Sequence, residues 1–195
     1  MERPHTKSAT QEHAGQGRDR GGAPTQSALI VPVGAAESVV GGFRADLDPA
    51  AALGVPAHVT VIAPFAPPRL IDGNLLAALA EAVRTVSAFD AVFAQVAWFA
   101  DTVVWLAPEP SAPFRELTER VWARFPDYPP YGGIYNDIVP HLTIGENSSL
   151  NDMRAAAQVI ERSLPITARV DRVALIQGSA AAASWRTVAE LPLAD

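Results

Sequence analysis

The same order of secondary-structure elements is expected twice along this chain, and each copy begins with the same strand pattern. Residues 57–63 and 141–144 both favour short strands, and each strand carries a histidine, an apolar residue and a threonine in succession. A helical pattern and two strand-like segments follow each of them. The copies span about residues 58–107 and 141–191 and share little identity outside their first strands. The pattern predicts an α+β fold of two similar lobes with pseudo-twofold symmetry and a central cleft.

Apolar residues at helical spacing indicate four helices. Two of them, near residues 36–47 and 112–125, precede the two copies. The other two lie inside the copies, after Asp72 and Asn151. Asp, Asn and Ser side chains cap helix N-termini, so we expect Asp72, Asn151 and Ser111 each to begin a helix.

Segments enriched in Val, Ile, Phe and Trp indicate further strands. They cover residues 28–33, 89–99, 102–107, 166–176 and 184–191. Within the fourth of these segments, the parity of the inward-facing residues changes between Val170 and Val173. A bulge near Asp171 is the expected way to keep both halves in one strand.

The first 26 residues differ in composition from the rest of the chain. They contain no Val, Ile, Leu, Phe, Tyr or Trp, so they cannot supply a hydrophobic core. We therefore expect residues 1–26 to form a disordered tail, in which His5 and His13 are solvated. Residues 27–195 are expected to form a single bilobal domain.

Composition excludes several classes of function. The chain has no cysteine, which rules out a thiol nucleophile, a disulfide scaffold and thiolate zinc sites. Its net charge of −6 argues against charge-driven binding along DNA or long RNA. No apolar run reaches the roughly 18 residues of a membrane span, and the first residues lack the apolar stretch of a signal peptide. We expect a cytoplasmic monomer that binds no membrane.

Both histidines outside the tail belong to the repeated strand pattern. In a strand, residues i and i+2 project from the same face, so His58 and Thr60 share one face, as do His141 and Thr143. One neutral and one protonated imidazole can serve as base and acid in phosphodiester chemistry, while the hydroxyls hold phosphate oxygens. The alternative is that these histidines are satisfied core residues and that the threonines serve β-propensity alone.

These two motifs resemble those of the 2H phosphoesterase superfamily, which includes bacterial 2'-5' RNA ligases and 2',3'-cyclic nucleotide phosphodiesterases. That superfamily is defined by two His-x-Thr/Ser motifs with apolar neighbours. The segment Val59–Phe65, and Tyr131-Gly132-Gly133 upstream of Val139-Pro140-His141, also look like the bacterial branch. The resemblance covers about residues 27–193.

The resemblance implies a bilobal α+β protein whose two motifs line a central cleft. It implies a cofactor-free, metal-independent phosphodiesterase acting on 2',3'-cyclic phosphates or 2',5'-linked nucleotides and RNA ends, with 2'-5' RNA ligation as the reverse activity. In that interpretation, His58 and His141 are the acid and base, and Thr60 and Thr143 bind the phosphate. The residues do not decide which histidine is the base.

Several other residues are candidates for contact with a small nucleotide or an RNA end. Phe65, Tyr131 and Trp185 could stack on a base, although core packing is the alternative for Phe65 and Trp185. Arg69 and Arg186 could pair with a phosphate, or they could form surface ion pairs.

Two other functions remain open at this level. The first is a non-catalytic nucleotide sensor or carrier that uses the same pocket. The second is a metallohydrolase, which would need carboxylates beside His58 and His141. Neither motif has a cluster of carboxylates next to it in the sequence.

Overall fold

The computed structural model describes residues 23–135 and 137–195. The expected tail, with His5 and His13, therefore lies almost wholly outside the described residues. Regular pairing begins slightly earlier than the expected domain start at Ser27, because the Thr25 N–H donates to the carbonyl of Gly178 at 2.8 Å. Among the described residues, no helix has both the length and the apolarity that a membrane span requires.

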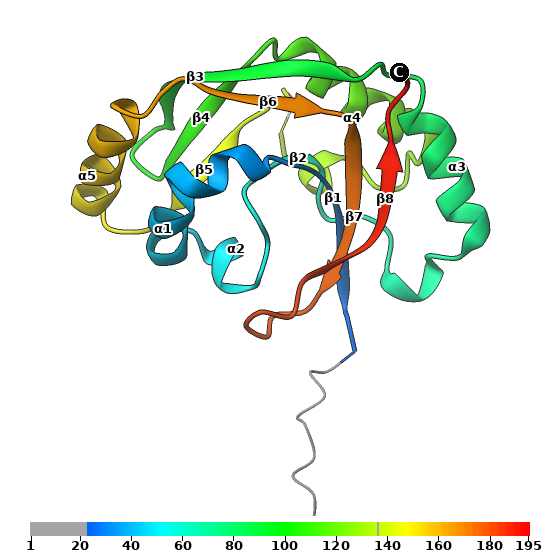
Figure 1. Ribbon diagram of the computed structural model, residues 1–195. Helices are drawn as coiled ribbons and strands as arrows, with labels where there is room; N and C mark the ends of the chain where they lie inside the picture. The colour runs from blue at the N-terminus through cyan, green and yellow to red at the C-terminus, as the bar shows by residue number, and fades with distance from the viewer. Residues whose placement is uncertain (1–22, 136) are drawn as a thin grey trace, which may run out of the picture.

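Two antiparallel sheets of four strands each form the framework of the described residues (Figure 1). The first has the order β2-β1-β7-β8 and consists of β1 (Gln26–Pro32), β2 (His58–Ile62), β7 (Arg172–Gly178) and β8 (Arg186–Pro192). The second has the order β5-β4-β3-β6 and consists of β3 (Phe89–Phe99), β4 (Val103–Glu109), β5 (Leu142–Glu146) and β6 (Ile166–Val170).

Helices cover these sheets and connect their strands. They are α1 (Glu37–Leu47), α2 (Pro49–Ala52), α3 (Gly73–Val83), α4 (Ala112–Arg124) and α5 (Leu150–Glu161), with short 3-10 turns η1 (Gly34–Ala36), η2 (Pro68–Leu70) and η3 (Pro130–Gly133). In Figure 1, α3 lies on the side of β8 and α5 at the opposite end of the molecule.

The predicted symmetry is present in the sheets, but the repeat units are placed differently from the expectation. Each sheet takes strands from both halves of the chain, so the units 58–107 and 141–191 do not each form a lobe. What repeats is an edge strand that begins at or directly after a histidine and pairs with the strand before it. β2 pairs with β1 across α1, and β5 pairs with β4 across α4, which makes His58 and His141 equivalent positions.

The connecting helices cross from one sheet to the other. Helix α1 contacts β5 of the second sheet, and α4 contacts β2 of the first. The Thr118 hydroxyl of α4 donates to the carbonyl of Val61 in β2 at 3.1 Å. Because each histidine-bearing strand is backed by the helix from the other half, β2 and β5 are themselves in contact.

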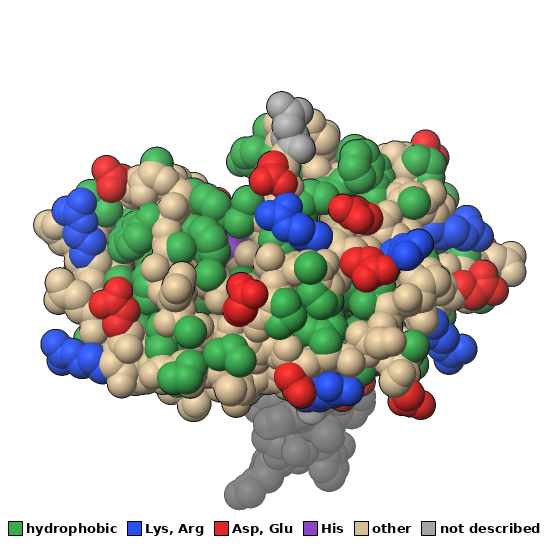
Figure 2. Space-filling model, turned by 90° about the horizontal axis from the view of Figure 1, so that it is seen from above, with side chains coloured by type: hydrophobic (Ala, Val, Ile, Leu, Met, Phe, Trp, Pro, Cys, Tyr) green, Lys and Arg blue, Asp and Glu red, His purple; other side chains and the backbone are tan. Residues whose placement is uncertain are grey.

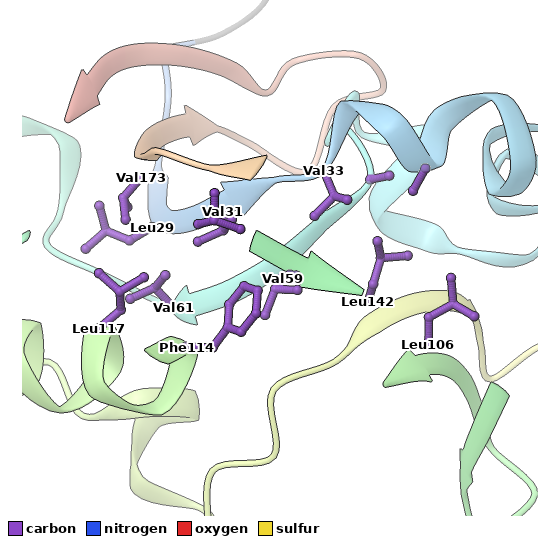
Figure 3. Close-up of a cluster of buried hydrophobic side chains, with 14 of the residues drawn as sticks. Leu29, Val31, Val33, Val59, Val61, Leu106, Phe114, Leu117, Leu142 and Val173 are labelled. Atoms are coloured by element: carbon purple, nitrogen blue, oxygen red, sulfur yellow. The ribbon is translucent and has the colours of Figure 1, made fainter. Parts of the chain in front are cut away.

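One hydrophobic core runs through both sheets (Figure 3). β1 is buried on both faces, with Leu29 and Val31 in this core, and Ala28 and Ile30 in a smaller cluster on the other face of the sheet. The main core also takes residues from β2, β4, β5 and α4, among them Val59, Val61, Leu106, Leu142, Phe114 and Leu117. This shared core holds the two sheets as one body.

The segment 166–176 is not the single bulged strand that its sequence suggested. It forms β6 and β7, which are separated at Asp171 and belong to different sheets. The change of parity between Val170 and Val173 marks the point where the chain passes from the second sheet to the first. Both residues are buried, each in its own sheet.

Of the three predicted helix caps, one is confirmed. The Asp72 carboxylate accepts from the Leu75 N–H at 2.8 Å and begins α3. Ser111 makes no capping bond, because its own backbone is already helical and its hydroxyl is not placed to accept. Asn151 is wrong as a cap, since α5 begins earlier and Ser149 accepts from the Asp152 N–H at 3.5 Å.

Among the described glycines, Gly178 has the least room for a side chain. A Cβ there would overlap the indole of Trp185, whose Nε1–H donates to the carbonyl of Ser179 at 3.0 Å. We expect Gly178→Ala to lower the free energy of unfolding by about 1–3 kcal/mol. Urea unfolding of this variant beside Gly73→Ala, whose Cβ meets open space, measures the effect. Equal stability of the two variants would contradict it.

Candidate active site

The two predicted histidines make the same backbone contact. Nδ1 of His58 lies 2.8 Å from the carbonyl oxygen of Pro56, and Nδ1 of His141 lies 2.7 Å from that of Val139. A carbonyl oxygen only accepts hydrogen bonds, so Nδ1 of each ring carries the hydrogen. In the neutral rings, Nε2 is then the basic nitrogen and is left for a ligand.

Side chains along the two motif segments alternate between the core and the surface, and both motifs lie on the surface face. His58, Thr60, His141 and Thr143 are half-buried, whereas the intervening residues belong to the core. Each histidine therefore shares a face with its threonine, as the spacing predicted. In Figure 2 a small area of histidine surface is visible in a hollow between hydrophobic surface and a group of charged side chains.

Tyr131 connects the two motifs. Its hydroxyl lies close enough to the Thr60 side chain for that group to oppose the rise in its pKa, and its ring lies nearly parallel to that of His141, with 16° between the planes and 6.5 Å between the centroids. Its backbone has φ 53°, a left-handed conformation that is uncommon outside glycine and is often found at functional sites. Burial raises the pKa of Tyr131 to about 12, so the hydroxyl stays protonated near neutral pH.

Two aromatic residues beside His141 were not identified from the sequence as part of a site. The rings of Phe99 and Trp105 lie 5.1 and 5.8 Å from the His141 ring, centroid to centroid, and stack on each other at 4.7 Å. Trp105 is paired with Thr143 across the sheet, so both side chains project from the same face. Only that strand register, which the sequence does not specify, places Trp105 near His141.

Burial lowers the pKa of both histidines, by different amounts. The pKa of His58 falls to about 4, chiefly by burial, with opposing effects from the Pro56 carbonyl and from Asp48, and further lowering by Arg44 and His141. The pKa of His141 is also lowered by burial, while the Val139 carbonyl and Glu146 act to raise it. Both rings are therefore neutral near pH 7.

The lowered pKa of His58 makes stability depend on pH. Between its folded value of about 4 and its ordinary value of 6.5, the unfolded chain binds more protons than the folded chain. The free energy of unfolding therefore falls as the pH drops through this window. Because His58 is partly exposed, we expect this fall to be only about 1–2 kcal/mol larger in the parent than in His58→Gln. Urea unfolding at both ends of the window tests this, and equal falls would contradict it.

The remaining predicted contacts are placed away from the histidines. Phe65 is only 4% exposed and packs edge-on against Phe125 and Tyr128, so its suggested role in stacking on a base is wrong. Arg186 lies on β8, at the opposite edge of the first sheet from β2. Three strand spacings, about 14 Å, separate these two edges, so the structure adds no support for its suggested phosphate contact, which stays a prediction.

Of two further candidates for substrate contact, one is exposed on the surface and the other packs in the smaller core cluster. Arg69 is exposed on η2, and among the described residues no hydrogen bond or ion pair joins it to either motif. Trp185 covers Gly178 and packs against the smaller core cluster, which is the structural role considered for it. In the described part of the chain, no three His, Asp or Glu side chains come together as metal ligands.

Comparison with known families and structures gives a consistent result. The family described as "2'-5' RNA ligase superfamily" matches residues 31–181. Escherichia coli LigT in complex with 3'-AMP is 16% identical, with a TM-score of 0.55, and the match covers 89% of this chain and 100% of LigT. Thermus thermophilus TT0787 is 16% identical, with a TM-score of 0.58, and the match covers 86% and 97% of the two chains. No curated protein matches the chain in sequence.

Proposed function

Because the chain belongs to the 2'-5' RNA ligase superfamily, we propose that it is a metal-independent phosphodiesterase for 2',3'-cyclic phosphates or 2',5'-linked nucleotides. One observation carries the proposal: two neutral imidazoles, each held at Nδ1 by a carbonyl two residues earlier, stand on adjoining edge strands. Two equivalent Nε2 atoms on neighbouring segments support an acid-base role for this pair. The complexes of LigT with 3'-AMP and ATP add support for a nucleotide ligand.

The reaction needs two proton transfers around one phosphorus atom. For a cyclic phosphate, Nε2 of the neutral histidine takes a proton from the attacking water as the new P–O bond forms. The other histidine acts in its protonated form, which is the minor state near pH 7 because both rings favour the neutral form, and gives its Nε2 proton to the ribose oxygen as the old P–O bond breaks. Thr60, Thr143 and Tyr131 have hydroxyls that can donate to the non-bridging oxygens, where negative charge accumulates. When a 5'-hydroxyl attacks the cyclic phosphate in place of water, the same two proton transfers form the P–O5' bond and break the P–O3' bond, which gives a 2'-5' linkage.

The charges around the two rings favour one assignment of these roles. Apart from burial, the Arg44 guanidinium opposes protonation of His58 more than its partner Asp48 favours it, whereas the Glu146 carboxylate favours protonation of His141. His58 is therefore assigned as the base in hydrolysis and His141 as the acid. In a coupled pair the two apparent pKa values belong to the pair, so a pH–rate profile reports the state of both rings together.

The proposal is tested by hydrolysis of 2',3'-cyclic AMP and of a 2',5'-linked diadenylate in the presence of EDTA. We expect turnover of at least one compound, at a rate that the chelator does not change. Loss of turnover with EDTA, restored by a divalent metal, would instead favour a metallohydrolase. Binding of either compound without turnover, measured by calorimetry, would favour a nucleotide sensor or carrier.

A further inference from the structure

We propose that helix α1 positions His58, through two side chains that hold the backbone immediately before it. These are Glu37 and Arg44, and the backbone they hold is residues 55–57, which we call the His58 support segment. The proposal adds positioning residues to the function proposed above and depends on that function only for its activity measurement.

The contacts of α1 lie on both sides of the carbonyl that holds the ring. The Glu37 carboxylate accepts from the Ala57 N–H at 2.5 Å, and the Arg44 guanidinium donates to the Val55 carbonyl at 3.2 Å. Pro56 lies between them, and its carbonyl accepts the His58 Nδ1–H. Backbone bonds from the Val33 N–H to the Ala57 carbonyl at 2.8 Å and from the Val55 N–H to the Ala50 carbonyl at 3.1 Å also hold these neighbours. The side chains of α1 bind the remaining backbone groups on each side of the acceptor, and so help to set the direction of the ring.

The Arg44 side of this arrangement is itself rigid. Arg44 donates to Asp48 from Nε at 3.1 Å and from Nη2 at 2.8 Å, and both side chains are almost fully buried. Asp48 in turn accepts from the Ala50 N–H at 2.9 Å and caps α2. Two donors of one planar guanidinium on the same buried carboxylate oxygen restrict its orientation toward Val55.

Gly41 offers a second way to displace the Glu37 carboxylate. A Cβ at Gly41 would lie 2.9 Å from Glu37 Oε2, whereas a Cβ at the next residue, Gly42, would meet open space. Because Oε2 is the far end of a flexible side chain, a methyl group at position 41 is expected to move the carboxylate and leave the helix backbone in place.

The other histidine has no comparable support among the described residues. The segment before His141 is tied through Asp137, whose carboxylate pairs with Arg115 at 2.8 Å on the surface. Side-chain exposures of 72% for Asp137 and 37% for Arg115 make this a weak tether. Loss of the α1 contacts is therefore expected to change His58 and leave His141 unchanged.

Four variants distinguish the positioning of His58 by Glu37 from the effect of the Glu37 charge and from a general loosening of the fold. Glu37→Ala removes the acceptor of the Ala57 N–H, whereas Glu37→Gln keeps an acceptor oxygen and removes the charge. Gly41→Ala keeps Glu37 and displaces its carboxylate. Gly42→Ala is the matched control, because it adds the same methyl group to the same helix in open space.

The decisive measurement is NMR titration of the histidine rings in the full chain, with His58→Gln used for assignment. In Glu37→Ala and Gly41→Ala we expect the His58 pKa to rise toward 6.5 by about one unit, because burial, its main cause of lowering, is relaxed. The groups that face the ring, Arg44, Asp48 and His141, are unchanged in these variants. We also expect the fixed Nδ1–H tautomer to become a mixture.

In the two controls, Glu37→Gln and Gly42→Ala, the His58 signals should match the parent, and His141 should be unchanged in every variant. Unchanged His58 signals in both Glu37→Ala and Gly41→Ala would overturn the proposal. So would equal changes at His58 and His141, which would indicate a general loosening of the fold.

Activity gives the second measurement. Misplacement of a catalytic group is expected to lower kcat about tenfold to a hundredfold in Glu37→Ala, with little change in KM and with recovery in Glu37→Gln. A parent with no turnover would count against the proposed function, while the NMR comparison would still decide the role of α1. An active Glu37→Ala variant with unchanged His58 signals would count against α1 alone.

Discussion

Replacing either His58 or His141 by alanine is expected to reduce kcat on 2',3'-cyclic AMP by about 10²–10⁴-fold, because in the proposed mechanism each ring transfers one of the two protons. The effect should lie in kcat more than in KM, since the threonine and tyrosine hydroxyls that would contact the phosphate remain. The double variant should be little worse than either single variant, because an acid and a base that act as a unit are not additive.

Steady-state kinetics of the three variants beside Thr60→Val measure this directly. Thr60→Val has nearly the same volume and removes one hydroxyl, so a smaller loss, about tenfold to a hundredfold, is expected. Circular dichroism confirms that each variant is folded. Activity that persists in either folded histidine variant would rule out the paired acid-base mechanism.

Replacing Arg44 by methionine is expected to lower the free energy of unfolding by about 3–5 kcal/mol, because it leaves the Asp48 carboxylate buried without its partner. The side chains of Arg44 and Asp48 are only 3% and 2% exposed, so water cannot replace the lost contact. Urea unfolding at pH 7 measures the change, with the parent under the same conditions.

The double variant Arg44→Met/Asp48→Asn is the matched control. Its asparagine removes the stranded charge and keeps an oxygen that can cap α2 as Asp48 does. It should recover a large part of the lost stability. If the double variant is as unstable as Arg44→Met, the cost comes from lost packing and not from an unpaired buried charge.

The local features of the fold were readable from the sequence where one segment decides them. Alternating apolar residues predicted the two histidine-bearing strands, and helical spacing predicted α1, α3, α4 and α5. Asp72 was a correct cap because capping involves only residues within one turn. Ser149 was missed in favour of Asn151, since both are suitable cap residues and the packing of the helix decides where it begins.

The change of sheet at Asp171 shows the limit of such reasoning. A change of parity is compatible with a bulge in one strand or with two strands in different sheets. The sequence predicted the first, and the structure has the second. Which of the two forms depends on the strands that pair with this segment. β3 pairs with β6, and β1 pairs with β7. Those partners lie far away in the chain.

In the candidate site, too, some features were predictable from the sequence and others depended on tertiary contacts. Strand alternation predicted that each histidine and its threonine share a face, and an exposed role was one interpretation of Tyr131 in its Pro/Gly-rich loop. Glu37 and Arg44 carried no sequence signal of a link to His58, which lies 14 or more positions away. Phe65 follows a motif directly in sequence, yet α4 and the residues after it enclose its ring.

By itself, the sequence determined the two His-x-Thr strands, the order of helices and strands around them, and the absence of thiol chemistry. These properties depend on residue type and short-range spacing, which the backbone converts into faces of strands and helices. Tertiary structure alone decided the pairing of strands into sheets, the exchange of α1 and α4 between them, and the contacts around each imidazole. Those outcomes depend on long-range packing, because the burial of one shared core selects partners that no local pattern encodes.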